Sequence, residues 1–274
     1  MVLSSLINHQ RRWRELAAQL GDEFEPIQAP PDESYARIFL LHGIGGIGKS
    51  WLARRCLALA QTVEFEPSLL TLYDDLSLGP PVLEPIDLLQ RLYQHLAAAG
   101  YKTALAPFRQ TQAELPNLTD RLARYRTEHR DRWADLLQTA AESIQNSSVR
   151  LDKATDLLLV EMEQAGLLTS DEARLGRDPA GVLAAKLVAG LGRIVRERPA
   201  VLALDNLEIA VPLEPFIRDH LVLPTVSWPL LWLLSGRHNL ADERVVEIDG
   251  QERVHKGYRD LLGENPPLVW DMST

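Results

Sequence analysis

The sequence alternates between short runs of apolar residues and longer segments in which apolar residues recur every three or four positions. Runs of strand length lie at 36–42, 69–73, 201–205, 230–235 and 268–271. Helical spacing marks the segments 49–61, 86–96 and 178–198, and the last begins with Asp178-Pro179, a favourable pair for a helix start. Strands that alternate with helices in this way predict an α/β fold built on a parallel sheet.

The segment from about Pro107 to Leu168 differs from the rest of the chain. Its apolar residues keep to steps of three and four positions, with charged residues between them and no run of strand length. This pattern predicts a helical hairpin inserted between the second and third strands. Residues 1–34 are expected to form an amphipathic helix and a proline-containing linker. Residues 35–274 then form the core domain, with its helical insertion at about 107–168.

Composition and charge narrow the class of protein. The 274 residues are 46% hydrophobic and 24% charged, with 29 Lys and Arg against 38 Asp and Glu, which gives a net charge of −9. This balance is typical of a globular domain and excludes collagen-like and disordered chains. A single cysteine, Cys56, excludes an internal disulfide, and its apolar helical surroundings predict that it is buried.

The same features bear on location and partners. No apolar stretch has the length of a membrane span, and arginines at 11, 12 and 14 interrupt the N-terminal segment where a secretory signal needs an apolar core. The negative net charge argues against direct binding of nucleic acid by this segment. We therefore expect a cytoplasmic protein with no membrane partner and no direct nucleic-acid partner.

A glycine-rich segment joins the first strand to the first helix of the core. It matches the pattern G-x-x-x-x-G-K-[ST] of a phosphate-binding loop without a gap. Glycines in such a loop let backbone N–H groups converge on phosphate oxygens, and the following helix adds its positive N-terminal end. The lysine reaches the β- and γ-phosphates, and the serine hydroxyl binds Mg²⁺. The predicted nucleotide-binding residues are Gly43, Ile44, Gly45, Gly46, Ile47, Gly48, Lys49 and Ser50.

Two later strands end in residues that suit the same chemistry. The run at 201–205 ends in Asp205, which is placed to hold Mg²⁺ together with Ser50. Glu208 follows three residues later and is a candidate to orient or deprotonate a water molecule. After the run at 230–235 comes Arg237, whose guanidinium can stabilise the charge of a γ-phosphate. Because the carboxyl ends of parallel strands share one edge of a sheet, we expect these residues to join Lys49 there as the catalytic group.

These motifs, in this order, resemble the STAND class of P-loop NTPases, with the NB-ARC and NACHT branches and the ATPase modules of large bacterial regulators as the nearest likenesses. The resemblance rests on GIGGIGKS at 43–50, LDNLE at 204–208 and SGR at 235–237. It implies a three-layer fold with a five-stranded parallel sheet in the order 5-1-4-3-2, and ATP or ADP with Mg²⁺ as cofactors. It also implies signal transduction by a slow ATP hydrolase, in which the nucleotide governs a switch between a closed monomer and an open oligomer.

The sequence departs from the family pattern in three places. Asn206 stands where many relatives carry a second acid, although Glu208 fits a D-N-x-E variant of the motif. His9 stands where relatives carry an arginine near the adenine. The chain ends at Thr274, whereas relatives continue into a helical lid, a winged-helix part and a repeat sensor. We therefore expect the chain to be part of a longer product, with self-association and contacts to lid, sensor and effector domains.

Two alternatives remain open. One is a non-hydrolysing scaffold that binds ADP or ATP as a structural cofactor and works by self-association, since bound nucleotide stabilises a fold without turnover. The other is a small-molecule kinase. Against a kinase stand the lack of an arginine cluster in a short lid segment and the long helical insertion, which has no place in that compact fold.

Overall fold

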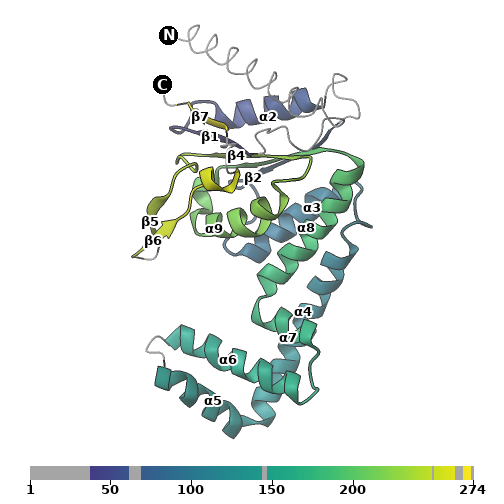
Figure 1. Cartoon of the computed structure of the whole chain (residues 1–274), viewed down its shortest axis with the longest axis vertical. Helices are drawn as coiled ribbons and strands as arrows, with labels where there is room; N and C mark the ends of the chain where they lie inside the picture. The colour runs from purple at the N-terminus through teal and green to yellow at the C-terminus, as the bar shows by residue number, and fades with distance from the viewer. Residues whose placement is uncertain (1–37, 62–68, 144–146, 249, 263–267, 273–274) are drawn as a thin grey trace. The chain divides into compact units, whose positions relative to one another are not determined.

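A computed structural model describes residues 38–61, 69–143, 147–248, 250–262 and 268–272 (Figure 1). The predicted N-terminal helix and linker at 1–34, with His9, lie outside the described residues. None of the helices within the described ranges combines the length and the apolar character needed to cross a bilayer.

A parallel sheet forms the centre of one compact unit of the chain, the sheet unit, whose described residues lie up to 104 and from 188 onward. Hydrogen bonds join its strands in the order β2-β3-β4-β1-β7 (Figure 1). The strand bounds are β1 Ile38–His42, β2 Leu70–Asp75, β3 Ala200–Asp205, β4 Leu230–Gly236 and β7 Leu268–Asp271. The central strands β3 and β4 are buried along their whole length, as strands covered on both faces must be. The α/β class and the parallel sheet predicted from the sequence are therefore confirmed.

Helices cover both faces of this sheet (Figure 1). Those of this part of the chain are α2 Lys49–Ala60, α3 Pro85–Ala98, α8 Pro179–Glu197 and α9 Glu214–Phe216. Helix α2 packs on one face, where Leu52, Ala53 and Cys56 join the apolar side chains of β1, β3 and β4 in one core cluster. Cys56 is fully buried there, as predicted. Helix α8 begins at the predicted position because the Asp178 carboxylate accepts a hydrogen bond of 2.8 Å from the N–H of Gly181.

Short turns of helix follow β3 and the hairpin described below. Their bounds are η1 Leu207–Ile209, η2 Val211–Leu213, η3 Ile217–Val222, η4 Leu223–Thr225 and η5 Arg259–Leu262. The turn η4 places Thr225 against β4, where its hydroxyl accepts a hydrogen bond of 2.9 Å from the indole N–H of Trp232. This contact satisfies the one polar atom of a large side chain that is almost completely buried.

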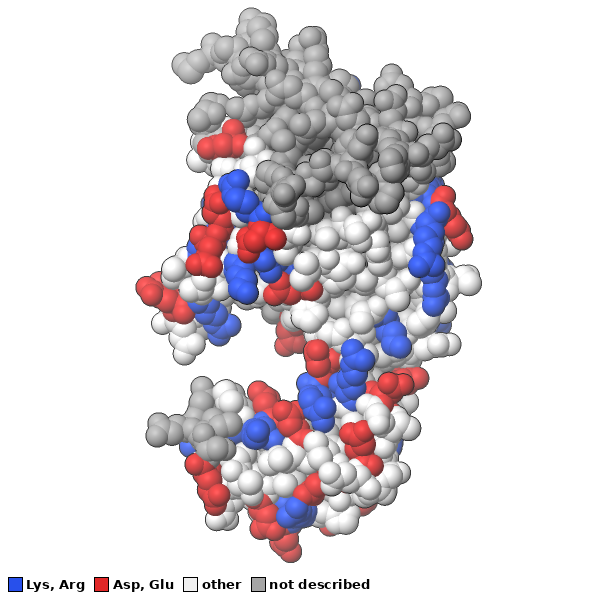
Figure 2. All heavy atoms as spheres, viewed as in Figure 1, with Lys and Arg blue, Asp and Glu red and all other residues white. Residues whose placement is uncertain are grey.

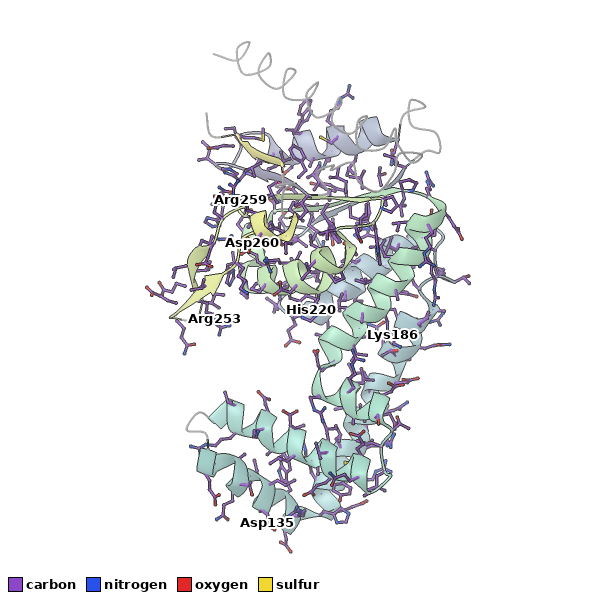
Figure 3. All side chains as sticks on the ribbon, in the orientation of Figure 1. Asp135, Lys186, His220, Arg253, Arg259 and Asp260 are labelled. Atoms are coloured by element: carbon purple, nitrogen blue, oxygen red, sulfur yellow. The ribbon has the colours of Figure 1, made fainter. Side chains whose placement is uncertain are left out.

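An antiparallel hairpin of β5 (Arg244–Ile248) and β6 (Gln251–His255) lies between β4 and β7 in sequence and is not predicted by the apolar pattern. The sequence does carry a signal for it, because an Asp-Gly pair at 249–250 separates the two strands. A buried ionic group holds its base: Glu214 of α9 pairs with Arg244 and lies 2.9 Å from Nδ1 of His255. The rest of β6 is exposed, including Arg253 (Figure 3).

Residues 105–187 form a second compact unit, which is helical. It contains the first half of α8 and the helices α4 Ala106–Glu128, α5 Arg130–Ser143, α6 Ser147–Gln164 and α7 Ser170–Arg177. The unit is longer than the segment 107–168 inferred from apolar periodicity, and it has more helices than a hairpin. Apolar periodicity does not predict helix α7, because this helix has only eight residues and few apolar ones. A capping box between Thr169 and Glu172 fixes its start.

The helical unit has a hydrophobic core of its own. Side chains from α4, α5, α6 and α7 form one cluster, whose buried members include Leu118, Leu122, Leu136, Ala140, Ala154, Leu158, Leu159, Met162 and Leu175. These are the positions at which apolar residues recur along the sequence, so the periodicity that marks this segment reflects its internal packing.

Candidate functional site

The glycine-rich loop leaves β1 and enters α2 at Lys49. Gly46 and Gly48 have φ angles of +77° and +100°, a region that residues with a Cβ atom rarely adopt. The Lys49 side chain is 7% exposed, and its Nζ donates hydrogen bonds to the carbonyls of Gly43 at 2.7 Å and Ile44 at 3.0 Å. The lysine therefore folds back over the loop instead of extending into solvent.

Lys49 lies in the electric field of the other predicted catalytic residues. Burial lowers the pKa of its ammonium group, Arg237 adds to this lowering, and the carboxylates of Glu208 and Asp205 oppose it. These four residues lie at or just after the ends of three different strands, β1, β3 and β4. The structure therefore brings the predicted catalytic residues together at the carboxyl edge of the sheet.

Asp205, the last residue of β3, is completely buried. Its Oδ2 accepts a hydrogen bond of 2.6 Å from the hydroxyl of Tyr73, and its Oδ1 accepts one of 2.9 Å from the backbone N–H of Asn206. Burial raises the pKa of Tyr73, and its hydrogen bond to Asp205 adds to the effect, so the phenol stays protonated as a donor. Each carboxylate oxygen retains a lone pair for one further partner.

Glu208 and Arg237 form an ion pair beside the loop. Glu208 lies in η1, and its Oε1 accepts a hydrogen bond of 3.1 Å from Nε of Arg237. Its other oxygen, Oε2, is buried without a hydrogen-bond partner. A Cβ atom placed on Gly45 would lie 3.6 Å from Nη2 of Arg237, so the guanidinium also lies against the glycine-rich loop.

A polar network at the end of β2 supports this site and was not identified from the sequence. Asp75 stands opposite Asp205 in the register of β2 and β3. Its Oδ1 accepts hydrogen bonds from the backbone N–H of Ser77 at 3.0 Å and from the amide of Asn206 at 2.7 Å. Burial acts to raise the pKa of Asp75, but hydrogen bonds from the hydroxyl of Ser77, from Asn206 and from the Ser77 backbone, together with the charge of Arg54, hold it below its usual value. Asn206 adopts a left-handed conformation, with φ of +59°, that lets it reach Asp75.

Arg54 connects this network to the helix that carries Lys49. It lies on α2, its Nη2 is 3.5 Å from Oδ2 of Asp75, and its guanidinium stacks 5.0 Å from the ring centre of Tyr73. Tyr73 in turn donates to Asp205. One signal could have found these residues: Asp74 and Asp75 close an apolar run, and parallel strands place such ends at one edge.

The donor set fits a hydrated Mg²⁺ ion next to a phosphate. Ser50, the second residue of α2, is partly exposed, and Asp205 supplies carboxylate oxygens on the neighbouring part of the edge. Mg²⁺ commonly takes one or two protein oxygens and keeps several waters, so a full protein cage is unnecessary. Among the described residues, no three His, Cys, Asp or Glu side chains form such a cage. Two buried oxygens at this edge, Glu208 Oε2 and Ser235 Oγ, have no partner and are available to polar groups of a ligand.

Comparison with models of known protein families gives no match to the chain, and neither does comparison with curated proteins. On the face shown in Figure 2, Lys and Arg side chains are interspersed with Asp and Glu, and the described residues of that face present no unbroken basic surface. Function is therefore inferred from the chemistry of the carboxyl edge.

Proposed function

We propose that this chain is the ATP- and ADP-binding module of a STAND-type signalling NTPase, in which Mg²⁺-dependent hydrolysis controls the oligomerisation of a larger protein. The strand order supports this proposal: counted from β7, with β7 as the fifth strand of the sheet, it is 5-1-4-3-2, which is the order implied by the resemblance. The left-handed glycines of the loop support it as well.

The observation that carries the proposal is the surroundings of Lys49. A buried ammonium group lies on the carbonyls of its own loop, within the field of two carboxylates and one guanidinium from other strands. A lysine without a binding role is ordinarily exposed, so its burial among other charged side chains indicates a functional role. Perturbed ionisable groups that converge at the carboxyl edge of an α/β sheet indicate a binding or catalytic site.

The residues take the following roles in this proposal. Backbone N–H groups of the loop and the start of α2 bind the phosphates, and Lys49 exchanges its two carbonyl partners for phosphate oxygens. Ser50 and Asp205 would hold Mg²⁺, which neutralises charge on the β- and γ-phosphates. Arg237 lies on the loop and is placed to contact the γ-phosphate. Glu208, once Arg237 turns to a phosphate, has a free carboxylate with which to accept a proton from water.

Two observations favour the alternative of a non-hydrolysing scaffold. Asn206 stands where many relatives carry a second acid, and its amide is bound to Asp75. Glu208 is held in an ion pair with Arg237, which opposes a role as a general base while the pair persists. A module of this kind binds ADP or ATP tightly and uses it to stabilise its fold and its assemblies.

Nucleotide binding and phosphate release by the wild type and Glu208→Gln test both proposals. The switch module predicts that both proteins bind ATP and ADP with Mg²⁺, and that slow phosphate release by the wild type falls to background in the variant. Equal background rates with retained binding would favour the scaffold. Lack of binding by the wild type would overturn both. Glu161→Gln is the matched control, because Glu161 pairs with an arginine, Arg132, in the helical unit.

A further inference from the structure

A buried serine hydroxyl near the candidate site has no hydrogen-bond partner. Ser235, near the end of β4, is 0% exposed, and its Oγ is one of three buried side-chain atoms without a partner among the described residues. The others are Glu208 Oε2 and, in the helical unit, Arg126 Nε. A buried polar group without a partner destabilises the folded state, because it has lost its hydrogen bonds to water. A hydroxyl at the end of a strand of Leu and Trp side chains therefore requires a reason beyond packing.

The sheet places Ser235 between the metal-side acid and the phosphate loop. Strand β4 lies between β3 and β1, and Ser235 pairs with Leu41 of β1. The paired residues of β3 and β4 end at Leu204 and Leu234, so continuation of this register by one residue sets Asp205 beside Ser235. Leu231 and Leu233 belong to the core cluster under α2. Side chains alternate along a strand, so Ser235 faces the same side as that cluster, toward the helix that carries Lys49.

Asp205 does not account for this hydroxyl. The oxygens of Asp205 accept hydrogen bonds from Tyr73 and from the backbone of Asn206, and neither oxygen is a hydrogen-bond partner of Ser235 Oγ. A serine hydroxyl offers one donor and two acceptor positions, which suits a water molecule better than a phosphate oxygen that only accepts. A hydrated Mg²⁺ held from Asp205 would place such water molecules at this depth of the site.

We propose that Ser235 is a binding residue of the nucleotide site and that its hydroxyl hydrogen-bonds a water molecule of the Mg²⁺ shell beside Asp205. This inference rests on the proposed function. It also explains why the sequence keeps a polar atom at a position where an apolar side chain would stabilise the empty protein.

The test is Ser235→Ala, measured for thermal stability without nucleotide and for ATP affinity with Mg²⁺ and with EDTA. The expected result is an unchanged or higher melting temperature of the empty protein, because an unpartnered polar atom is removed. Affinity for ATP with Mg²⁺ should fall about threefold to tenfold, the scale of one neutral hydrogen bond. Affinity in EDTA should stay the same, since the contact acts through the metal's water shell.

Thr225→Val is the matched control, because the buried hydroxyl of Thr225 has its partners. It accepts from Trp232 and donates to the carbonyls of Leu221 and Val222, each contact being 2.9 Å long. This variant should lose stability and keep its affinity for ATP. The inference is overturned if Ser235→Ala is destabilised as Thr225→Val is, if its affinity with Mg²⁺ is unchanged, or if affinity falls equally with and without Mg²⁺. A wild type that binds no nucleotide refutes the proposed function itself, and a wild type that binds it while the variant binds equally well refutes this inference alone.

Discussion

The two units of the chain use charged side chains in different ways. In the helical unit, arginines pair with glutamates across neighbouring helices, as Arg132 does with Glu161 and Arg121 with Glu172, and all four side chains remain partly exposed. In the sheet unit, charged groups gather at the carboxyl edge, where Lys49 and Asp205 are buried. Exposed pairs contribute little to stability, whereas buried charges cost solvation free energy. The contrast agrees with the proposal that the charged groups at the sheet edge bind a ligand, whereas those of the helical unit form exposed ion pairs between helices.

The unpartnered buried atoms sharpen this contrast. In the described part of the helical unit, Nε of Arg126 is such an atom, but the same guanidinium donates to Thr155 at 2.8 Å and lies 4.4 Å from the ring centre of Trp133. Its π-face contact offsets part of the cost of burial. The unpartnered oxygens of Glu208 and Ser235 have no such substitute among the described contacts, and both lie at the sheet edge. Unsatisfied polarity thus accumulates where a ligand is proposed to bind.

The largest effect is expected for Lys49→Ala. Removal of the ammonium should weaken ATP and ADP alike by about 100-fold or more, because charge-assisted hydrogen bonds to phosphate are among the strongest in proteins. The fold should persist, since the variant loses two hydrogen bonds but also a buried charge. Calorimetric titration with each nucleotide measures the affinity, and circular dichroism measures the fold. Lys153→Ala, an exposed lysine of α6, should bind as the wild type does.

Unchanged nucleotide affinity in Lys49→Ala would contradict the inference that the buried charges at the sheet edge bind a ligand. The lysine would then be an ordinary structural residue, and the glycine-rich loop would be a turn without a ligand.

A smaller and more selective effect is expected for Arg237→Ala. Its guanidinium lies against the glycine-rich loop, and under the proposed function it contacts the γ-phosphate, so the variant should lose about 1–3 kcal/mol in binding ATP and less in binding ADP. Arg132→Ala is a close control, because Arg132 is also exposed and also pairs with a glutamate, but in the helical unit. Dissociation constants for both nucleotides at one Mg²⁺ concentration measure the difference. Equal losses for ATP and ADP, or none, would make Arg237 a surface residue like Arg132.

Much of this edge follows from the sequence for a physical reason. Parallel strands must end at the same edge, so residues that follow apolar runs, such as Asp205 and Arg237, can be assigned to one site without knowledge of the fold. The conformation of Asn206 and its bond to Asp75 could not be assigned in this way, because they depend on a side-chain contact between segments far apart in sequence. The partnerless state of Ser235 is likewise a property of three-dimensional packing.

The fold shows the same division. The bounds of long periodic segments such as 178–198 are predicted almost to the residue, because apolar residues that recur over several helical turns show which face of the helix is buried. Helix α7 and the β5–β6 hairpin are too short to show such recurrence. The start of α7 depends on a cap at Thr169, and the sequence signal for the hairpin is the Asp-Gly pair at 249–250. Local hydrogen bonds of this kind give a weaker signal than apolar spacing.

Asp75→Asn is expected to change stability in a manner that depends on pH. The pKa of Asp75 is held below its usual value of 3.8, so its ionised form stabilises the folded state. That contribution is fully present above pH 3.8 and is lost as the pH falls through the lower folded-state pKa. The variant should therefore lose about 1–2 kcal/mol of unfolding free energy at pH 7, and the gap should narrow below about pH 4.

Urea unfolding of both proteins across this pH range measures the gap. Asp135→Asn is the control from the helical unit, because Asp135 is exposed on α5 (Figure 3) and should show no gap at any pH. A gap for Asp75→Asn that stays constant with pH would mean that the network at the end of β2 does not depend on the charge of Asp75.

The smallest effect is expected when the helical unit is removed. Residues 105–187 have a core of their own, whereas the candidate catalytic residues all belong to the sheet unit. A Gly/Ser bridge would join Ala104 to Val188, and the side chain of Arg193, further along α8, donates a hydrogen bond of 3.5 Å to the carbonyl of Ala104. The shortened protein should fold cooperatively and bind ATP within about twofold of the full chain, since it retains the core of the sheet unit and all the candidate binding residues. Calorimetric titration and thermal unfolding of the shortened and full chains give both quantities. A folded but non-binding product would show that the helical unit contributes to the nucleotide site, and the division of labour between the two units would then have to be abandoned.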